Sequence, residues 1–156
     1  MKHNLITLTI DHKTVEVPEG TTILAAAKSV GISIPTLCYL NLSDFGCVNT
    51  PSSCRMCLVE VEGRRNLAPA CVTPASDKMT VSTNSVRALK TRKTMLELLL
   101  SDHPKDCLTC QKSGNCELQS LADKFSIRDI KLKGEQSAYR LDISKSLISD
   151  MDKCIM

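Results

Sequence analysis

Residues 103–116 read HPKDCLTCQKSGNC. This run holds one imidazole and three thiols, with three, two and five residues between successive candidate ligands. Pro104 disfavours the helical conformation at His103, so we expect the imidazole to be presented just after a helix ends. Two kinds of centre fit this donor set. One is a zinc ion bound by three cysteines and a histidine, and the other is an iron–sulfur cluster.

The composition of the whole chain favours metal binding. The 156 residues include nine Cys but only two Tyr, two Phe and no Trp. Aromatic side chains usually supply much of a core's buried area, and metal centres are one substitute in small domains. The N-terminus lacks a signal peptide's apolar run, and no stretch is long enough to span a membrane. We therefore expect a cytoplasmic chain whose reduced thiols ligate metal. A formal charge of +3 is too small to indicate a nucleic-acid partner.

The first half of the chain has the pattern of a small α+β domain. Residues 5–10 and 14–17 alternate apolar and polar side chains, which predicts a β-hairpin. A helix is expected over residues 23–30, with a threonine as its N-cap and Gly31 as its stop. Further short strands are expected at residues 58–61, 67–71 and 79–82. A hairpin followed by a helix that crosses the sheet is the start of a β-grasp domain.

Four more cysteines are candidate ligands in this domain: Cys38, Cys54, Cys57 and Cys71. Cys54 and Cys57 form a C-x2-C pair, and Cys38 and Cys71 lie further away on either side of it. This arrangement is typical of plant-type 2Fe–2S sites, in which one loop supplies most of the ligands and a later residue supplies the last. The C-x2-C pair directly precedes the strand expected at residues 58–61, which would anchor its backbone. The backbone N–H groups of Arg55 and Met56 are then free to point at sulfur. Cys47 could replace one member of the pair, although its ordinary role would be a free thiol in a loop.

The second half of the chain reads as mainly helical. Helices are expected over residues 85–100 and 117–125, with a short strand at 127–132. In the longer helix, apolar residues share one side: Val86, Leu89, Leu96, Leu99 and Leu100. Its first half also carries several basic residues, an arrangement opposite to the one that the helix dipole favours: Arg87, Lys90, Arg92 and Lys93. We interpret these basic residues as a solvated face, with a docking surface for an acidic partner as the alternative.

Several motifs together resemble one family of redox proteins. The segments IPTLCY (34–39), CRMCLVEVEG (54–63) and PACVTP (69–74) resemble a 2Fe–2S domain. That domain occurs in the N-terminal regions of FeFe-hydrogenases, of the large iron–sulfur subunit of NADH dehydrogenase (complex I), and of NAD-linked formate dehydrogenases. Residues 103–119 look like the same family's histidine-ligated 4Fe–4S motif. The resemblance covers about residues 4–130.

The resemblance implies a fold, two cofactors and their ligands. The fold would be α+β, with a 2Fe–2S ferredoxin-like β-grasp domain over residues 1–82. A small, mainly helical 4Fe–4S domain over residues 83–130 and a connector over 131–156 would follow. The implied 2Fe–2S ligands are Cys38, Cys54, Cys57 and Cys71. The implied 4Fe–4S ligands are His103, Cys107, Cys110 and Cys116.

The chain departs from the family pattern in two places. The loop between Cys38 and Cys54 is longer than expected, which leaves the role of Cys47 open. Residues 152–156 resemble the start of a further 4Fe–4S motif that is cut off after Cys154. Nothing in the chain resembles a hydrogen-activating, molybdenum or nucleotide site, so we expect no catalytic site here.

The resulting functional prediction is an electron-transfer module of a soluble NAD(P)-linked oxidoreductase complex, first of all a hydrogenase. It would relay single electrons between its two clusters. Its partners would be flavin/NAD-binding and catalytic subunits, with no nucleic acid and no direct membrane insertion. The alternatives are a subunit of a complex I-like or formate dehydrogenase, or a structural zinc protein. A thiol catalyst using Cys54 and Cys57 is a further alternative, but the chain lacks the thioredoxin-like βαβ context for it.

Overall fold

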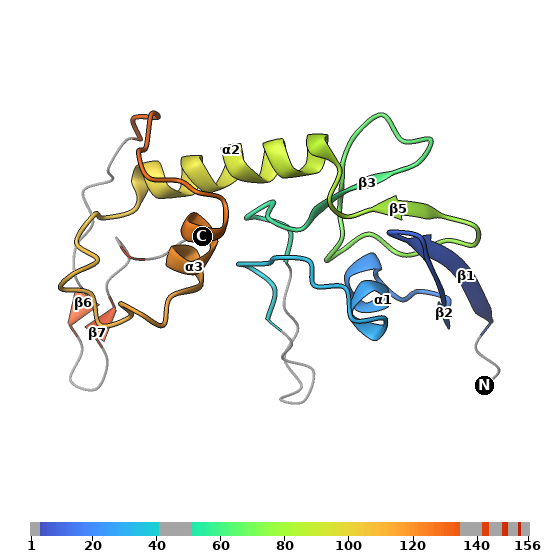
Figure 1. Cartoon of the computed structure of the whole chain (residues 1–156). Coiled ribbons are helices and arrows are strands. Elements are labelled where there is room, and N and C mark those ends of the chain that lie inside the picture. The colour runs from blue at the N-terminus through green and yellow to red at the C-terminus, as the bar shows by residue number, and fades with distance from the viewer. Residues whose placement is uncertain (1–3, 41–50, 135–141, 144–147, 150–152, 154–156) are drawn as a thin grey trace. The chain divides into compact units, whose positions relative to one another are not determined.

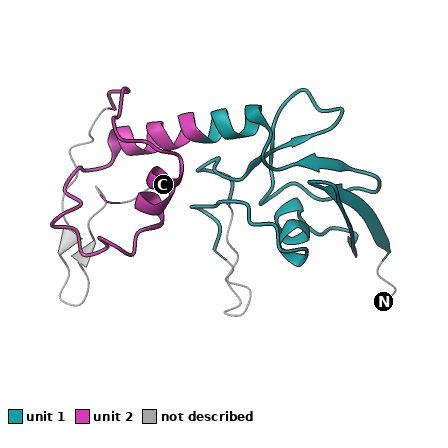
Figure 2. Cartoon of the chain, viewed as in Figure 1, with its two compact units in different colours: residues 1–92 teal, residues 93–156 magenta. Residues whose placement is uncertain are grey.

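The computed structural model describes residues 4–40, 51–134, 142–143, 148–149 and 153 (Figure 1). The chain divides into two compact units, residues 1–92 and 93–156 (Figure 2). The division falls within a helix, whereas the functional boundary expected at residue 82 stays a prediction. Across the described ranges, no helix combines the length and the apolar character needed to cross a lipid bilayer.

The first unit is built on a five-stranded mixed sheet with the strand order β2-β1-β5-β3-β4. Its strands are β1 (Leu5–Ile10), β2 (Lys13–Pro18), β3 (Leu58–Val61), β4 (Ala68–Pro69) and β5 (Thr80–Ser82). Strands β1 and β5 run parallel, and the other pairs are antiparallel. Helix α1 (Ile23–Ser29) lies beside the β1–β2 hairpin (Figure 1). This architecture confirms the predicted α+β class.

The β1–β2 hairpin forms where the alternating pattern predicted it. Its two-residue turn places Asp11 and His12 at φ angles of 46° and 69°, the left-handed pair that matches the twist of the flanking strands. The Asp11 carboxylate accepts a hydrogen bond from Thr83 N at 2.7 Å and another from the Thr83 hydroxyl. The turn is therefore tied to the chain just beyond β5.

Helix α1 begins and ends at the residues that its sequence indicates. The Thr22 hydroxyl accepts a hydrogen bond from Ala25 N at 3.3 Å, which confirms the expected threonine cap. Gly31 follows the helix with a φ of 75°, in the left-handed conformation typical of a helix stop. The side chains of Ile23, Ala26 and Ala27 are fully buried in the core. The small alanines allow the helix to lie close to the other core residues.

Helix α2 (Val86–Asp102) buries a different side from the one predicted. Its fully buried residues are Ala88, Arg92 and Leu96, spaced four apart along one face. Val86, by contrast, is 83% exposed, and Leu89 is also exposed. The predicted apolar side is therefore wrong in the first half of the helix. The interpretation of Arg92 as part of a solvated face is wrong as well.

The second unit contains the end of α2, helix α3 (Glu117–Lys124) and a two-stranded ribbon. The ribbon pairs β6 (Asp142–Ile143) with β7 (Ile148–Ser149). The strand expected at residues 127–132 is wrong, because these described residues form no regular structure. Alternating apolar residues make a strand only where a neighbouring strand can pair with them.

Candidate metal centres

The first candidate centre lies in the first unit, where all four predicted thiols are buried. Cys57 directly precedes β3 and Cys71 follows β4. The antiparallel pairing of these strands brings the two sulfurs within 3.2 Å of each other. The backbone supports this approach, since Ala70 N donates to the Cys57 carbonyl at 3.1 Å.

The other two thiols of this unit, Cys38 and Cys54, also form a pair through their side chains. Ser52 N donates to the Cys38 sulfur at 3.3 Å. The Met56 backbone N–H similarly points at the Cys54 sulfur, as the C-x2-C spacing predicted. Between the paired cysteines, Arg55 has a φ of 57°. This left-handed residue turns the loop sharply, so that backbone N–H groups face sulfur.

Cys71 interacts electrostatically with the three other predicted thiols of the first unit. The pKa of the Cys71 thiol is raised to about 12, first by burial, then by its neighbour Cys57, and then by Cys38 and Cys54. Burial also raises the pKa of Cys54. Burial alone would raise the pKa of Cys38 as well, but hydrogen bonds from backbone N–H groups and from the Cys54 side chain together outweigh burial and lower that pKa. The raised pKa values keep Cys54 and Cys71 protonated near neutral pH, so a metal would have to displace their protons to bind them as thiolates.

The donor set fits a two-iron centre better than a single zinc ion. A structural zinc site gathers four donors around one point. Two thiol pairs that interact electrostatically instead match a 2Fe–2S cluster, in which two thiolates can serve each iron.

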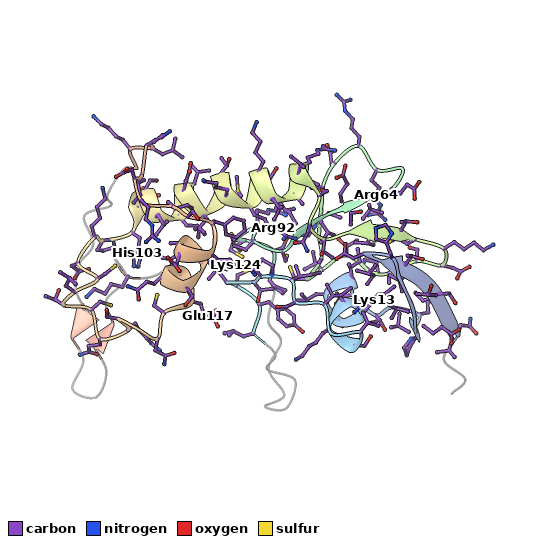
Figure 3. All side chains as sticks on the ribbon, in the orientation of Figure 1. Lys13, Arg64, Arg92, His103, Glu117 and Lys124 are labelled. Atoms are coloured by element: carbon purple, nitrogen blue, oxygen red, sulfur yellow. The ribbon has the colours of Figure 1, made fainter. Side chains whose placement is uncertain are left out.

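The second candidate centre starts at His103, the first residue after α2 (Figure 3). This placement confirms that the imidazole follows directly on a helix end. Its Nδ1 atom is buried and lacks a hydrogen-bond partner within the described part of the chain. Burial lowers the pKa of His103, which favours the neutral imidazole that binds metals. A buried, unsatisfied ring nitrogen is what a metal ligand without its metal would show.

The three cysteines of this centre lie on the loop between α2 and α3. Cys110 N donates to the Cys107 carbonyl at 3.3 Å, and Gly114 N donates to Gln119 Oε1 at 3.1 Å. Gly114 has a φ of 80°, and Cys116 is the N-cap of α3. These tight turns fold the ligand loop back on itself. Among the described residues, these candidates do not converge on a single ion position.

The sequence did not predict two features near the first centre, the buried Arg92 side chain and the N–H donor of Ser52. Arg92 is buried and donates to the carbonyl oxygen of Leu58, next to Cys57. Its spacing of four from Ala88 and Leu96 was the available signal. Ser52 is the second feature, and no sequence pattern pointed to its N–H group as a donor to sulfur. Cys47 and Cys154 lie outside the described residues, so their roles stay predictions.

Comparison with known proteins identifies both regions. Residues 3–86 match the family model described as a 2Fe-2S iron-sulfur cluster binding domain. Residues 92–131 match the model described as the NADH-ubiquinone oxidoreductase-G iron-sulfur binding region. These matches confirm the predicted cofactors, one 2Fe–2S and one 4Fe–4S cluster.

Longer relatives resemble almost the whole chain. The NADP-reducing hydrogenase subunit HndD of Solidesulfovibrio fructosivorans is 64% identical over 98% of this chain and 26% of its own length. An NADH-quinone oxidoreductase subunit of Rhizobium meliloti is 40% identical over 97% of this chain and 18% of its own length. The chain thus spans about a quarter or less of these relatives.

One solved structure of a redox enzyme is also similar to almost the whole chain. A chain of the NAD+-reducing NiFe-hydrogenase in its H2-reduced state superimposes with a TM-score of 0.85 and 32% identity. The match covers 97% of this chain and 62% of that chain. Since the 2Fe–2S model spans more than half of its residues, the chain belongs to the family of 2Fe–2S iron–sulfur cluster binding domains.

Proposed function

We propose that this chain is a one-electron relay. A 2Fe–2S cluster is held by Cys38, Cys54, Cys57 and Cys71, and a 4Fe–4S cluster is held by His103, Cys107, Cys110 and Cys116. The observation that carries the proposal is the group of four buried thiols in two pairs, in a region of the matching family. When bound, such clusters supply reversible one-electron redox chemistry.

The protein residues hold each cluster and set its potential. The buried cysteines of the first unit exclude water from the metal. Backbone N–H groups of Ser52 and Met56 donate to sulfur, which stabilises negative charge there and favours the reduced state. His103 adds a neutral donor where a thiolate would add a charge, so the second centre is less negative than an all-cysteine site.

The name of the 64% identical relative, a hydrogenase subunit, supports a hydrogenase complex as the setting of this chain. The flavin/NAD-binding and catalytic partner subunits and the cytoplasmic location are part of our proposal and rest on the sequence motifs. The 40% identical relative belongs to an NADH-quinone oxidoreductase by its name. A complex of that type is therefore the second candidate.

Metal analysis and spectroscopy of single-site variants test the relay. Protein purified anaerobically from iron-replete cells should contain two irons from one cluster and four from the other, with matching acid-labile sulfide. Cys71→Ala should lose the 2Fe–2S EPR signal and keep the 4Fe–4S signal, and Cys116→Ala should do the reverse. Near-stoichiometric zinc in place of iron would contradict the proposal and support a structural zinc protein.

A further inference from the structure

Arg92 is a buried charge beside the first centre. Its side chain is 1% exposed and lies on α2 (Figure 3). Both Nε and Nη2 donate to the carbonyl oxygen of Leu58, at 2.9 Å and 2.6 Å. Leu58 begins β3 and directly follows Cys57. The guanidinium therefore anchors the backbone at the residue next to a proposed cluster ligand.

The protein itself gives this charge little compensation. Within the described residues, no carboxylate lies within ion-pair distance of Arg92. Asp11 acts on it only through space, and the Asp11 carboxylate accepts hydrogen bonds from Thr83. A guanidinium stays protonated in proteins, and a buried charge without a partner is unfavourable. The larger electrostatic influence on Arg92 comes from Cys57, which carries a negative charge only once a metal has replaced its proton.

A bound 2Fe–2S cluster would supply the missing negative charge. Its four thiolates and two sulfides together outweigh the charge of two ferric ions, so the oxidised site is already net negative. Reduction by one electron makes the site more negative still. A fixed cation nearby therefore stabilises the reduced state more than the oxidised state, which raises the reduction potential.

We propose that Arg92 is a positioning residue that compensates the charge of the 2Fe–2S cluster. It holds the Leu58 carbonyl and places its positive charge next to Cys57, and it thereby raises the reduction potential of that cluster. This inference rests on the proposed function, because it requires a cluster on the four buried thiols. The redox step itself moves one electron from an external reductant to the cluster and breaks no bond.

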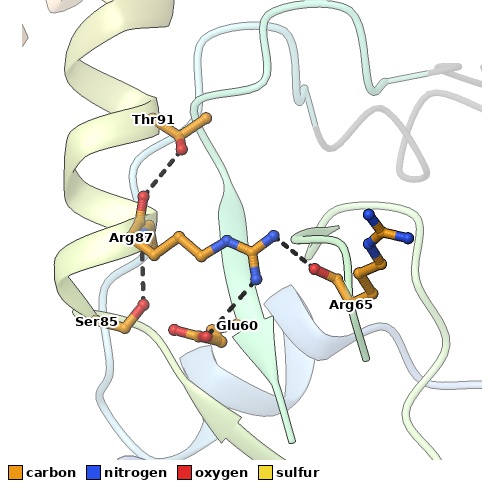
Figure 4. Close-up of polar contacts among 6 residues, drawn as sticks. Glu60, Arg65, Ser85, Arg87 and Thr91 are labelled. Carbon is orange, nitrogen blue, oxygen red and sulfur yellow. Dashed lines mark hydrogen bonds and ion pairs between the residues drawn. The ribbon is translucent and has the colours of Figure 1, made fainter. Parts of the chain in front are cut away.

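Two substitutions separate the charge of Arg92 from its hydrogen bonds. Arg92→Lys keeps a positive charge but loses the two-pronged donation to Leu58. Arg92→Gln keeps an N–H donor and removes the charge. Arg87→Gln is the matched control, since Arg87 lies on the same helix, donates to the Arg65 carbonyl at 2.5 Å and is half exposed beside Glu60 (Figure 4).

The measurement is a dithionite titration of the holoprotein, with the 2Fe–2S signal followed by EPR. We expect Arg92→Gln to shift the potential to more negative values, while Arg92→Lys and Arg87→Gln keep values close to the parental one. A parental chain without any 2Fe–2S signal would refute the proposed function itself. The variants are compared only when that signal is present, so the two failures are distinguishable.

Every outcome among the variants decides the inference. An unchanged potential in Arg92→Gln, or an equal shift in the Lys and Gln variants, would overturn it in favour of a structural role. If Arg92→Gln fails to retain its cluster, iron content decides instead. If Arg92→Lys then keeps the 2Fe–2S cluster at the parental potential, the site requires the positive charge, as proposed. If both variants lose the cluster, the proposal is refuted.

Discussion

His103 is the residue that distinguishes the chemistry of the second centre. An imidazole ligand is neutral and a thiolate carries a negative charge, so replacing one by the other changes the charge of the site. We expect His103→Cys to keep a 4Fe–4S cluster and to lower its reduction potential. Rieske centres, where histidines replace cysteines and the potential rises, show the same direction of effect. Redox titration monitored by EPR measures the shift.

The control for this substitution removes the ligand without replacing it. His103→Ala leaves one iron open to solvent, so its cluster should be lost within the time of an anaerobic purification that the parental protein survives. Iron content after purification is the readout. An unchanged potential in His103→Cys would mean that the buried Nδ1 atom has no role in binding the cluster.

Cys47 and Cys54 compete for one ligand position in the first centre. Cys54 is buried and its side chain interacts with that of Cys38, which supports Cys54 as the ligand. We expect Cys54→Ser to abolish or distort the 2Fe–2S EPR signal, and Cys47→Ser to leave it intact. If the two variants behaved the other way round, the ligand assignment would be wrong, although the fold would stand.

At the scale of the elements, the tie between the β1–β2 turn and the end of β5 is the contact easiest to test. Thr83 is fully buried and donates twice to Asp11. Thr83→Val keeps the shape and the backbone donor but removes the hydroxyl, so one carboxylate oxygen loses its partner. The free energy of unfolding should fall by about 1.5–3 kcal/mol, the usual effect of a lost hydrogen bond to a charged group.

Thr80→Val is the matched control for this contact. Thr80 lies on β5 and is exposed, so its substitution should change stability by less than about 0.5 kcal/mol. Thermal and urea unfolding of both variants provide the comparison. Equal stability losses would show that the Asp11–Thr83 contact is not specific.

The sequence predicted the elements whose signals are local. The hairpin, the Thr22 cap and the Gly31 stop each depend on residues within one turn or strand, and all three are confirmed. The buried side of α2 was missed, because hydrophobic periodicity treats every basic residue as solvent-facing. Arg92 overrides that rule through a carbonyl acceptor 34 positions away in the chain. Such a partner is visible only once the chain has folded.

The candidate site was predictable to a similar degree. Cysteine spacing and the strand after Cys57 indicated the four thiols of the first centre, which the structure brings together in two pairs. The left-handed Arg55 and the Ser52 donor could not be predicted. Arginine is not a residue type that favours a left-handed conformation, and every residue except proline has a backbone N–H group. The sequence therefore does not indicate which residue will turn the loop or donate to sulfur.

For the whole molecule, helix α2 is the element common to both regions. It carries Arg92 in the first unit and leads directly to His103 in the second. Helix α2 therefore contributes to both proposed centres. It supplies a buried cation beside the 2Fe–2S site, and its end positions a ligand of the 4Fe–4S site. Substitutions along α2 should accordingly be judged by the potentials of both clusters.

The last prediction concerns what the chain does alone. Iron–sulfur clusters accept one electron at a time, whereas NADH delivers two electrons as a hydride and needs a flavin or similar group to divide them. We expect the purified holoprotein to be reduced by dithionite in one-electron steps. It should show no reduction by NADH and no hydrogen evolution. Adding a flavin-containing partner subunit should then allow NADH to bleach the visible absorption. Reduction by NADH without any partner would contradict the relay and require a nucleotide site within this chain.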